Sequence, residues 1–292
     1  MALSKDEIFH HPELHAHIKV QSASLVGMFQ QDARLAAVFA TQQRWLMSHV
    51  GLALYFRGMT AGGRTGLHIT TFLEAVDNAR IASRNTADSY IKEMIKYKYV
   101  EMLTLPEDKR VRPLVPAPNV LMAITGWLRV HLASLDSLAG GERLATFDHD
   151  PSVLAQIQPI VSDGLVTARA VRHPEKTFSL FTWLDNGGLV MDWVITNMEN
   201  APMSAERVAV GNVSTVEMAH RLNLSRTHLA RKLREAESMG SIGWEGRRGH
   251  SVMWVSRSFR EEYAGAQAIK LSIIDHACEA VLGTKALGTT NA

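Results

Sequence analysis

The chain has 292 residues, 46% of them hydrophobic, and a formal net charge of +2. This length is sufficient for two domains with hydrophobic cores, and no run of about 18 apolar residues predicts a membrane span. Cys278 is the single cysteine, which excludes an intrachain disulfide and is typical of a reducing compartment. The first residues lack the apolar core of a signal peptide, so we expect a cytoplasmic protein.

The charge is unevenly distributed along the chain. Residues 221–260 carry nine Lys or Arg against three Asp or Glu, a net charge of +6. Residues 80–112 carry eight against five, a net charge of +3, which leaves −7 for the rest of the chain. Local basic surfaces of this kind attract phosphates even when the total charge is close to zero.

Helices are predicted for the first part of the chain. Residues 1–40 have apolar side chains at helical spacing, and residues 41–57 form a strong amphipathic pattern that ends at Gly58. A histidine cluster near the start has no neighbouring cysteine and lacks the spacing of a closed zinc site, so we expect no metal there. Its members are His10, His11, His15 and His17.

A helix, a turn and a second helix are predicted between about residues 70 and 98. Thr71 and Glu74 have the spacing of a capping box at the start of the first helix. Ser83 is placed to cap the second helix. The inward side of this second helix is formed by Ala87, Ile91 and Met94, and its outward side includes Asn85, Ser89 and Lys92.

A hairpin and a long helix follow. Strands are expected at residues 100–104 and 111–115, with a turn at 105–110 that contains proline, acidic and basic residues. Residues 119–138 are rich in apolar side chains and predict a long helix. The polar link that starts at Ala139-Gly140-Gly141 marks the expected domain boundary, giving domains 1–140 and 141–283.

The second half repeats this order. Residues 151–185 are predicted to be helical, with a loop near His173-Pro174, and residues 187–200 predict another helix. Ser214 and Glu217 have capping-box spacing, and Asn223 suits the left-handed conformation of a sharp turn. Ser225 is placed to cap a second helix that ends at Gly240 and whose inward side is formed by Leu229, Leu233 and Ala236.

Two strands and a long helix complete the second half. Strands are expected at residues 242–244 and 252–255, around a loop that contains Arg247 and Arg248. A helix is predicted over residues 258–282, and residues 284–292 are expected to be disordered. Ser83 and Ser225 align at a separation of 142 residues. A unit of about 140 residues used twice is therefore the simplest description.

The sequence LNLSRTHLARKLREAESMGSI, residues 222–242, resembles that of bacterial winged helix-turn-helix regulators. Residues 71–115 resemble a MarR-type winged helix, in which a proline-acid-basic wing tip follows the recognition helix. The resemblance implies a mainly α fold with small β-hairpin wings, arranged as two tandem winged helix-turn-helix domains with long flanking helices. It also implies a bacterial, nucleoid-associated transcriptional regulator that binds specific sequences in double-stranded DNA.

In such regulators the recognition helices enter the major groove and basic wings lie along the backbone. The resemblance implies DNA contacts in the second motif from Arg226, Thr227, His228, Arg231, Arg234, Arg247 and Arg248. In the first motif it implies contacts from Arg84, Asn85, Ser89, Lys92, Lys109, Arg110 and Arg112. The alternative use of the first motif is a protein interface that includes Tyr90, Tyr97 and Tyr99.

MarR-type regulators are usually two-fold dimers built through terminal helices, and they often bind small aromatic effectors. This chain is then either such a dimer fused into one polypeptide, or a protein that forms a homodimer through residues 264–282. A small aromatic effector is a further partner that the resemblance implies. Four tryptophans at apolar helical positions are expected in the core: Trp45, Trp127, Trp183 and Trp193.

An enzyme is not expected, because the sequence contains no Gly-rich phosphate loop, no paired carboxylates in a helical motif and no nucleophile elbow. The glycines at 58–66 lack a following Lys-Ser or Lys-Thr, so we expect no catalytic residue and no cofactor. Two other functions stay open. One is a non-enzymatic winged-helix adaptor for protein–protein contacts, of the chromosome-organisation type. The other is a replication-initiator-like DNA-binding protein.

Overall fold

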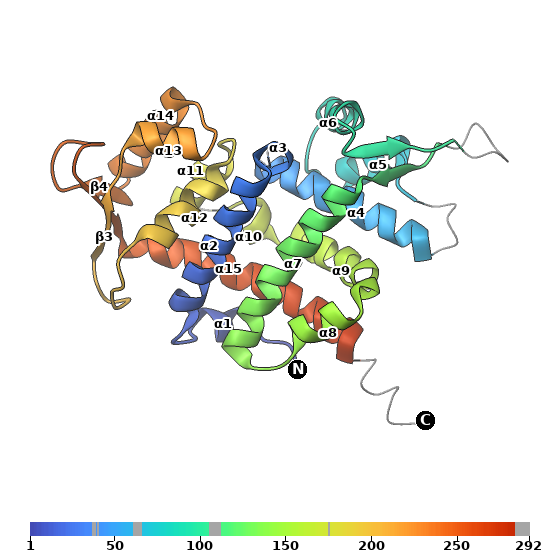
Figure 1. Ribbon diagram of the computed structural model, residues 1–292, viewed down its shortest axis with the longest axis horizontal. Helices are drawn as coiled ribbons and strands as arrows, with labels where there is room; N and C mark the ends of the chain where they lie inside the picture. The colour runs from blue at the N-terminus through green and yellow to red at the C-terminus, as the bar shows by residue number, and fades with distance from the viewer. Residues whose placement is uncertain (37–38, 40, 61–65, 105–111, 175, 284–292) are drawn as a thin grey trace. The chain divides into compact units, whose positions relative to one another are not determined.

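The computed structural model describes residues 1–36, 39, 41–60, 66–104, 112–174 and 176–283. Within these residues the chain is mainly helical and contains two small antiparallel sheets, one of two strands and one of three (Figure 1). This confirms the expected mainly α class with small β-hairpins. The expectation of disorder at 284–292 concerns residues outside the described ranges. In the described part of the chain, every helix is too short or too polar to cross a lipid bilayer.

The chain forms two compact units, and each is assembled from segments that lie far apart in the sequence. Unit 1 contains Met1–Ser4, Gln43–Arg172 and the residues from Lys270 onward. Unit 2 contains Lys5–Gln42 and His173–Ile269. This division differs from the sequential boundary expected near residue 140, because helices from both ends of the chain pack into the unit formed by the opposite half.

The main part of unit 1 starts with the long helix α4 and continues through the first predicted motif. Its elements are α4 (Gln42–Thr60), α5 (Ile69–Asn78), α6 (Arg84–Lys96), β1 (Val100–Met102), β2 (Leu114–Pro116), α7 (Pro118–Ala139), α8 (Arg143–His149), the 3₁₀ turn Pro151–Val153, α9 (Leu154–Thr167) and α10 (Arg169–Arg172). The last part of α15 (Arg257–Cys278) and the π-helical turn Glu279–Gly283 complete this unit.

Unit 2 contains the N-terminal helices and the second predicted motif. Its elements are α1 (Lys5–Phe9), α2 (Leu14–Gln31), α3 (Ala33–Ala36), α11 (Lys176–Thr182), α12 (Gly187–Asn197), β3 (Arg207–Asn212), α13 (Thr215–Arg221), α14 (Arg226–Ser238), β4 (Ile242–Trp244), β5 (Val252–Ser256) and the first part of α15. Helix α2 packs along α12, as the blue and yellow helices show in Figure 1.

A buried polar network joins the N-terminal helix α2 to the rest of unit 2. The Tyr263 hydroxyl donates a hydrogen bond to the Asp192 carboxylate, and Ser22 Oγ lies 2.7 Å from the same hydroxyl. Next to Ser22, Gln21 donates an amide–amide hydrogen bond of 2.9 Å to Gln267, which lies one turn after Tyr263 on α15. Because buried polar groups are costly without partners, these bonds fix the register of α2 against α12 and α15.

The two ends of the chain meet in unit 1. Arg143 at the start of α8 forms an ion pair of 2.7 Å with Asp275 in the last part of α15. The second oxygen of Asp275 accepts a hydrogen bond of 2.8 Å from the backbone N–H of Leu3. At Gly164 of α9, a Cβ atom would lie 2.5 Å from the Ile273 side chain. The glycine therefore permits the close packing of α9 on α15.

The two helix–turn–helix segments have the same backbone construction. In unit 1 Arg80 lies two residues after the end of α5 and has φ 52°, and the N–H of Ile81 donates to the carbonyl of Val76. In unit 2 Asn223 has φ 52°, and the N–H of Leu224 donates to the carbonyl of Ala219. This is the hydrogen bond of a Schellman ending. The predicted left-handed turn at Asn223 is confirmed.

The predicted helix caps are confirmed at Ser83 and Ser225, whose hydroxyls accept hydrogen bonds from the third residues of their helices, Thr86 and His228. The predicted start of α5 is wrong. His68 is its N-cap, and Thr71 is the N3 residue that bonds back to it, because the helix begins one turn earlier than the Thr71–Glu74 pattern indicated. Ser214 does cap α13, whereas Glu217 pairs with Arg221 at 2.7 Å.

The hairpin of unit 2 has a third strand that was not predicted. The strand order is β3-β5-β4, and β3 pairs with β5 from Arg207 to Asn212. The alternating sequence RVAVGN, with Val208 and Val210 buried, is the signal that could have revealed it. In unit 1 a backbone hydrogen bond of 2.7 Å lies in the equivalent place, from the N–H of Leu114 to the carbonyl of Leu67.

The tryptophan predictions are only partly confirmed. Trp45, Trp127 and Trp193 are half-buried on their helices. Trp183 was expected in the core, but 58% of its surface is exposed. It lies directly after the last residue of α11, so it falls outside the helical spacing that predicted its burial.

Candidate nucleic-acid interface

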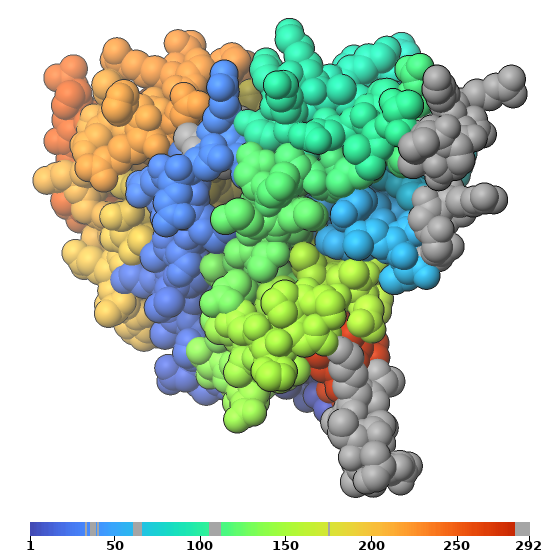
Figure 2. All heavy atoms as spheres, turned by 45° about the vertical axis from the view of Figure 1, so that its right-hand side comes forward, coloured from blue at the N-terminus to red at the C-terminus, as the bar shows by residue number. Residues whose placement is uncertain are grey.

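Helix α14 turns its charged side toward solvent. Leu229, Leu233 and Ala236 recur at helical spacing and are each at most 1% exposed, which fixes the rotation of the helix. The opposite side carries the residues predicted as contacts, and all of them are exposed: Arg226, Thr227, His228, Arg231 and Arg234. The orange α13 and α14 residues form part of the open surface in Figure 2.

The exposed arginines of α14 make weak interactions within the protein. Arg231 Nε lies 3.8 Å from the Glu235 carboxylate, and Arg234 Nε donates a long hydrogen bond of 3.3 Å to the carbonyl of Ala230. Exposed ion pairs contribute only about 0–1 kcal/mol. An arriving phosphate or base edge can therefore replace these contacts at low energetic cost.

The β4–β5 hairpin carries the two other predicted arginines of unit 2. Arg247 and Arg248 are both exposed. The Arg248 guanidinium forms an ion pair with Glu237 of α14 and lies 5.8 Å from the centre of the Trp244 ring. These contacts hold the base of the hairpin loop beside α14. Sequence reasoning missed the roles of Glu237 and Trp244, because neither pairing follows from helix or strand periodicity.

Two cations in the basic stretch 221–260 are engaged by groups away from the exposed side of α14. Arg260 is 1% exposed, and its guanidinium donates to the carbonyls of Pro202 and Ala205. Desolvation on burial lowers its pKa. Arg257 pairs with Glu261 at 2.8 Å. The local net charge of +6 is therefore larger than the positive charge that is available to a ligand on α14 and the β4–β5 hairpin.

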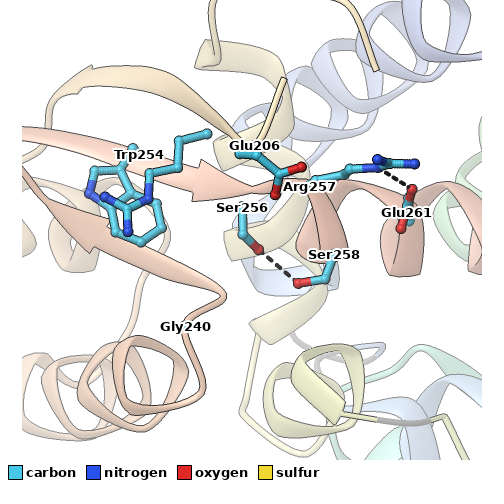
Figure 3. A pocket seen from close by; sticks show the side chains of 8 residues that line it. Glu206, Gly240, Trp254, Ser256, Arg257, Ser258 and Glu261 are labelled. Carbon is cyan, nitrogen blue, oxygen red and sulfur yellow. Dashed lines mark hydrogen bonds and ion pairs between the residues drawn. The ribbon is translucent and has the colours of Figure 1, made fainter. Parts of the chain in front are cut away.

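A shallow depression lies beside Gly240, two residues after α14 ends, and its lining residues are drawn in Figure 3. Its volume is about 540 Å³. Trp254 lies on one side of it, and the Arg207 guanidinium stacks over the indole at 4.1 Å. The acidic side chains of Glu206 and Glu261 line the same depression. Their negative charges offset the positive charges of Arg207 and Arg257, which also line it. This charge balance makes it a poor site for phosphate, in contrast to the exposed side of α14.

Helix α6 of unit 1 is built like α14 but is less basic on its outward side. Ala87, Ile91 and Met94 are buried, as predicted. The predicted contact residues Arg84, Asn85, Ser89 and Lys92 are exposed. Lys92 forms an ion pair of 2.7 Å with Asp88, one turn earlier, so part of its charge is neutralised. Of the predicted hairpin residues, Arg112 is exposed, and Lys109 and Arg110 lie outside the described residues.

The tyrosines proposed for a protein interface in unit 1 are mostly internal. Tyr90 is 5% exposed and Tyr99 is 8% exposed, because both point into the core around α6. The Tyr90 hydroxyl lies 2.6 Å from Ser48 Oγ, and burial raises the pKa of Tyr90 to about 12. Tyr97 alone of the three is exposed, at 50%.

Helix α6 is anchored to α4 by a charged contact as well. Arg44 donates to both carboxylate oxygens of Glu93, at 3.0 and 2.9 Å. The hydrogen bonds from Arg44 lower the pKa of Glu93. A forked pair of this kind fixes orientation as well as distance, so it sets which side of α6 faces outward.

A pair of buried histidines lies in the core of unit 1. His49 of α4 is 1% exposed, and its Nδ1 accepts a hydrogen bond of 2.9 Å from the Gln158 amide. His131 of α7 is fully buried, and its Nδ1 donates to the carbonyl of Trp127 at 2.7 Å. Desolvation lowers the pKa of His49 to about 3 and that of His131 well below 6.5. Both rings are therefore neutral.

Comparison with protein-family models, curated proteins and solved structures gives no significant match for this chain.

Proposed function

We propose that this protein is a transcriptional regulator that binds specific sequences in double-stranded DNA through two tandem winged-helix units. In this proposal α6 and α14 are the recognition helices, and the β1–β2 and β4–β5 hairpins are the wings. The observation that carries the proposal is the exposed side of α14, where three arginines lie opposite a fully buried apolar side. An ordinary solvated helix carries a mixture of Lys and Glu there.

The chemistry of this side suits nucleic acid. Arginine presents a planar fork of donors that matches phosphate oxygens and the O6 and N7 atoms of guanine. Arg226 in the first turn is placed to contact a phosphate, and Arg231 and Arg234 are placed to reach base edges. The hairpin adds Arg247 and Arg248, and the contact of Arg248 with Glu237 keeps the wing next to the helix.

The test of this proposal is binding of the full chain to duplex DNA over a range of salt concentrations. For the wild type we expect affinity to fall steeply as salt rises, because phosphate contacts release counterions. Replacing Arg231 and Arg247 by alanine should weaken binding by about 1–3 kcal/mol for a base contact and reduce the salt slope by about 1 per lost phosphate contact.

Arg221→Ala is the matched control. Arg221 is also exposed, but it is on α13 and pairs with Glu217, so its removal should leave DNA affinity unchanged. Arg231 and Arg247 are both exposed, so we expect their replacement to leave the fold intact. An unchanged melting temperature of the variant will show this. Equal affinity of the wild type and the Arg231→Ala/Arg247→Ala variant would refute the placement of the interface.

One observation favours protein docking by the first unit as a second candidate function. Around β1, the large apolar side chains of Tyr97, Met102 and Leu103 are 38–50% exposed. An adaptor of this kind would bind a protein partner through these residues and would bind no duplex DNA at any salt concentration. The same titration therefore separates the two functions.

A further inference from the structure

The two proposed recognition helices correspond residue for residue. From the helix cap to the start of the following strand, residues at a constant separation of 142 have the same structural role in both motifs. The pairs are the caps Ser83 and Ser225, the buried residues Ala87 and Leu229, Ile91 and Leu233, and Met94 and Ala236, the left-handed residues Lys98 and Gly240, and the strand starts Val100 and Ile242. The outward positions of α6 and α14 can therefore be compared directly.

Most outward side chains at equivalent positions differ between the two helices. Among the exposed positions of the two helices, only the first, Arg84 and Arg226, carries the same residue. At the other exposed positions Asn85 corresponds to Thr227, Thr86 to His228, Ser89 to Arg231, Lys92 to Arg234 and Lys96 to Ser238, and at one half-buried position Asp88 corresponds to Ala230. The buried framework is thus shared, whereas the side chains available to read bases are not.

These differences change which base each helix can recognise. Arg231 has the forked donors that pair with guanine, and its equivalent Ser89 has a short side chain with one hydroxyl. Asn85 has the amide that pairs with N6 and N7 of adenine, and its equivalent Thr227 cannot form that bidentate contact. Asp88 also places a carboxylate on α6 that holds Lys92 at 2.7 Å, whereas Ala230 leaves Arg234 without such a partner on α14.

We infer, on the basis of the proposed DNA-binding function, that one chain recognises a non-palindromic duplex composed of two unlike half-sites. Helix α14 reads a half-site that depends on guanine through Arg231. Helix α6 reads a different half-site that depends on adenine through Asn85. A symmetric pair of identical helices would instead require two identical half-sites related by a two-fold axis.

The experiment is selection of bound sequences from a pool of random duplexes, performed with the wild-type chain, Arg231→Ala and Asn85→Ala. We expect Arg231→Ala to lose the guanine preference in one half-site and to leave the other half-site unchanged. Asn85→Ala should lose an adenine preference in the other half-site alone. Duplexes that carry two copies of either half-site should bind more weakly than the selected duplex, by roughly 5- to 150-fold per lost base contact.

Arg231→Lys provides a variant that keeps the charge and removes the fork. Arg231→Lys should weaken the preference for guanine, while the dependence of DNA affinity on salt concentration stays the same. If Arg231 acted through its charge alone, the guanine preference would not change. Arg231 and Asn85 are both exposed, and a thermal melt of each variant checks that it is folded.

Three outcomes would overturn the inference: a selected site made of two identical half-sites, loss of preference at the same bases in both alanine variants, or no change of preference in Asn85→Ala. Failure of the wild-type chain to enrich any duplex is a distinct result. It would refute the proposed function itself.

Discussion

The buried histidines of unit 1 predict that the protein loses stability in mild acid. An unfolded histidine titrates near 6.5, whereas burial lowers the pKa of His49 to about 3. Between these values the unfolded chain binds a proton that folded His49 does not bind. The contribution of His49 to stability is therefore complete above pH 6.5 and is lost progressively as the pH falls toward 3.

The size of the effect follows from the difference between the two pKa values. Near pH 5 the unfolded state gains about 2 kcal/mol from protonation of His49, since each unit of pH below the unfolded pKa contributes about 1.4 kcal/mol. His131 acts in the same direction, because its pKa is also lowered by burial. A protonated His131 would in addition bury an N–H group at Nε2, which has no partner in the described structure.

Urea unfolding at about pH 7 and about pH 5, followed by tryptophan fluorescence, measures this loss. In His49→Gln, which cannot be protonated, the difference between the two pH values should be smaller than in the wild type by about 2 kcal/mol. His220→Gln replaces an exposed histidine of unit 2 and should behave like the wild type. An equal loss of stability in the wild type and in His49→Gln would refute the reasoning.

Two further predictions come from backbone conformation and close packing. Lys98 has φ 59°, at the position that Gly240 occupies in the second motif, so Lys98→Gly should stabilise the protein by about 1 kcal/mol and raise its melting temperature. A lower melting temperature in that variant would contradict this explanation. A Cβ at Gly243 would lie 2.2 Å from the Trp254 ring, so Gly243→Ala should destabilise unit 2 by about 1–3 kcal/mol in urea unfolding. A Gly243→Ala variant as stable as the wild type would show that the indole can move away.

Local features of the two motifs could be predicted from the sequence. Ser83 and Ser225 precede helices whose apolar residues recur at helical spacing, and both the caps and the buried sides of α6 and α14 are found as expected. These features depend on interactions within one or two turns of helix. The outward side of α14 follows from the same periodicity, because burial of Leu229 and Leu233 fixes the rotation of the helix.

Features that depend on distant residues could not be predicted in this way. The carboxylate of Asp275 pairs with Arg143 at a separation of 132 residues, and Ser22 meets Tyr263 across 241 residues. No periodicity in the sequence indicates either contact. The expected boundary near residue 140 therefore did not include the exchange of terminal segments. The ion pair of Arg248 with Glu237 spans only 11 residues, but it joins a hairpin loop to a helix, and no periodicity indicates such a contact.

The assembly of unit 2 from both ends of the chain has a consequence for folding during synthesis. Helices α1 and α2 are translated more than a hundred residues before their partners in α12 and α15. At roughly 5–20 residues per second, the apolar side of α2 remains uncovered for about 10 to 50 s. The apolar side chains of Ile18, Val26 and Phe29 are therefore exposed to solvent until Tyr263 and Gln267 have been translated.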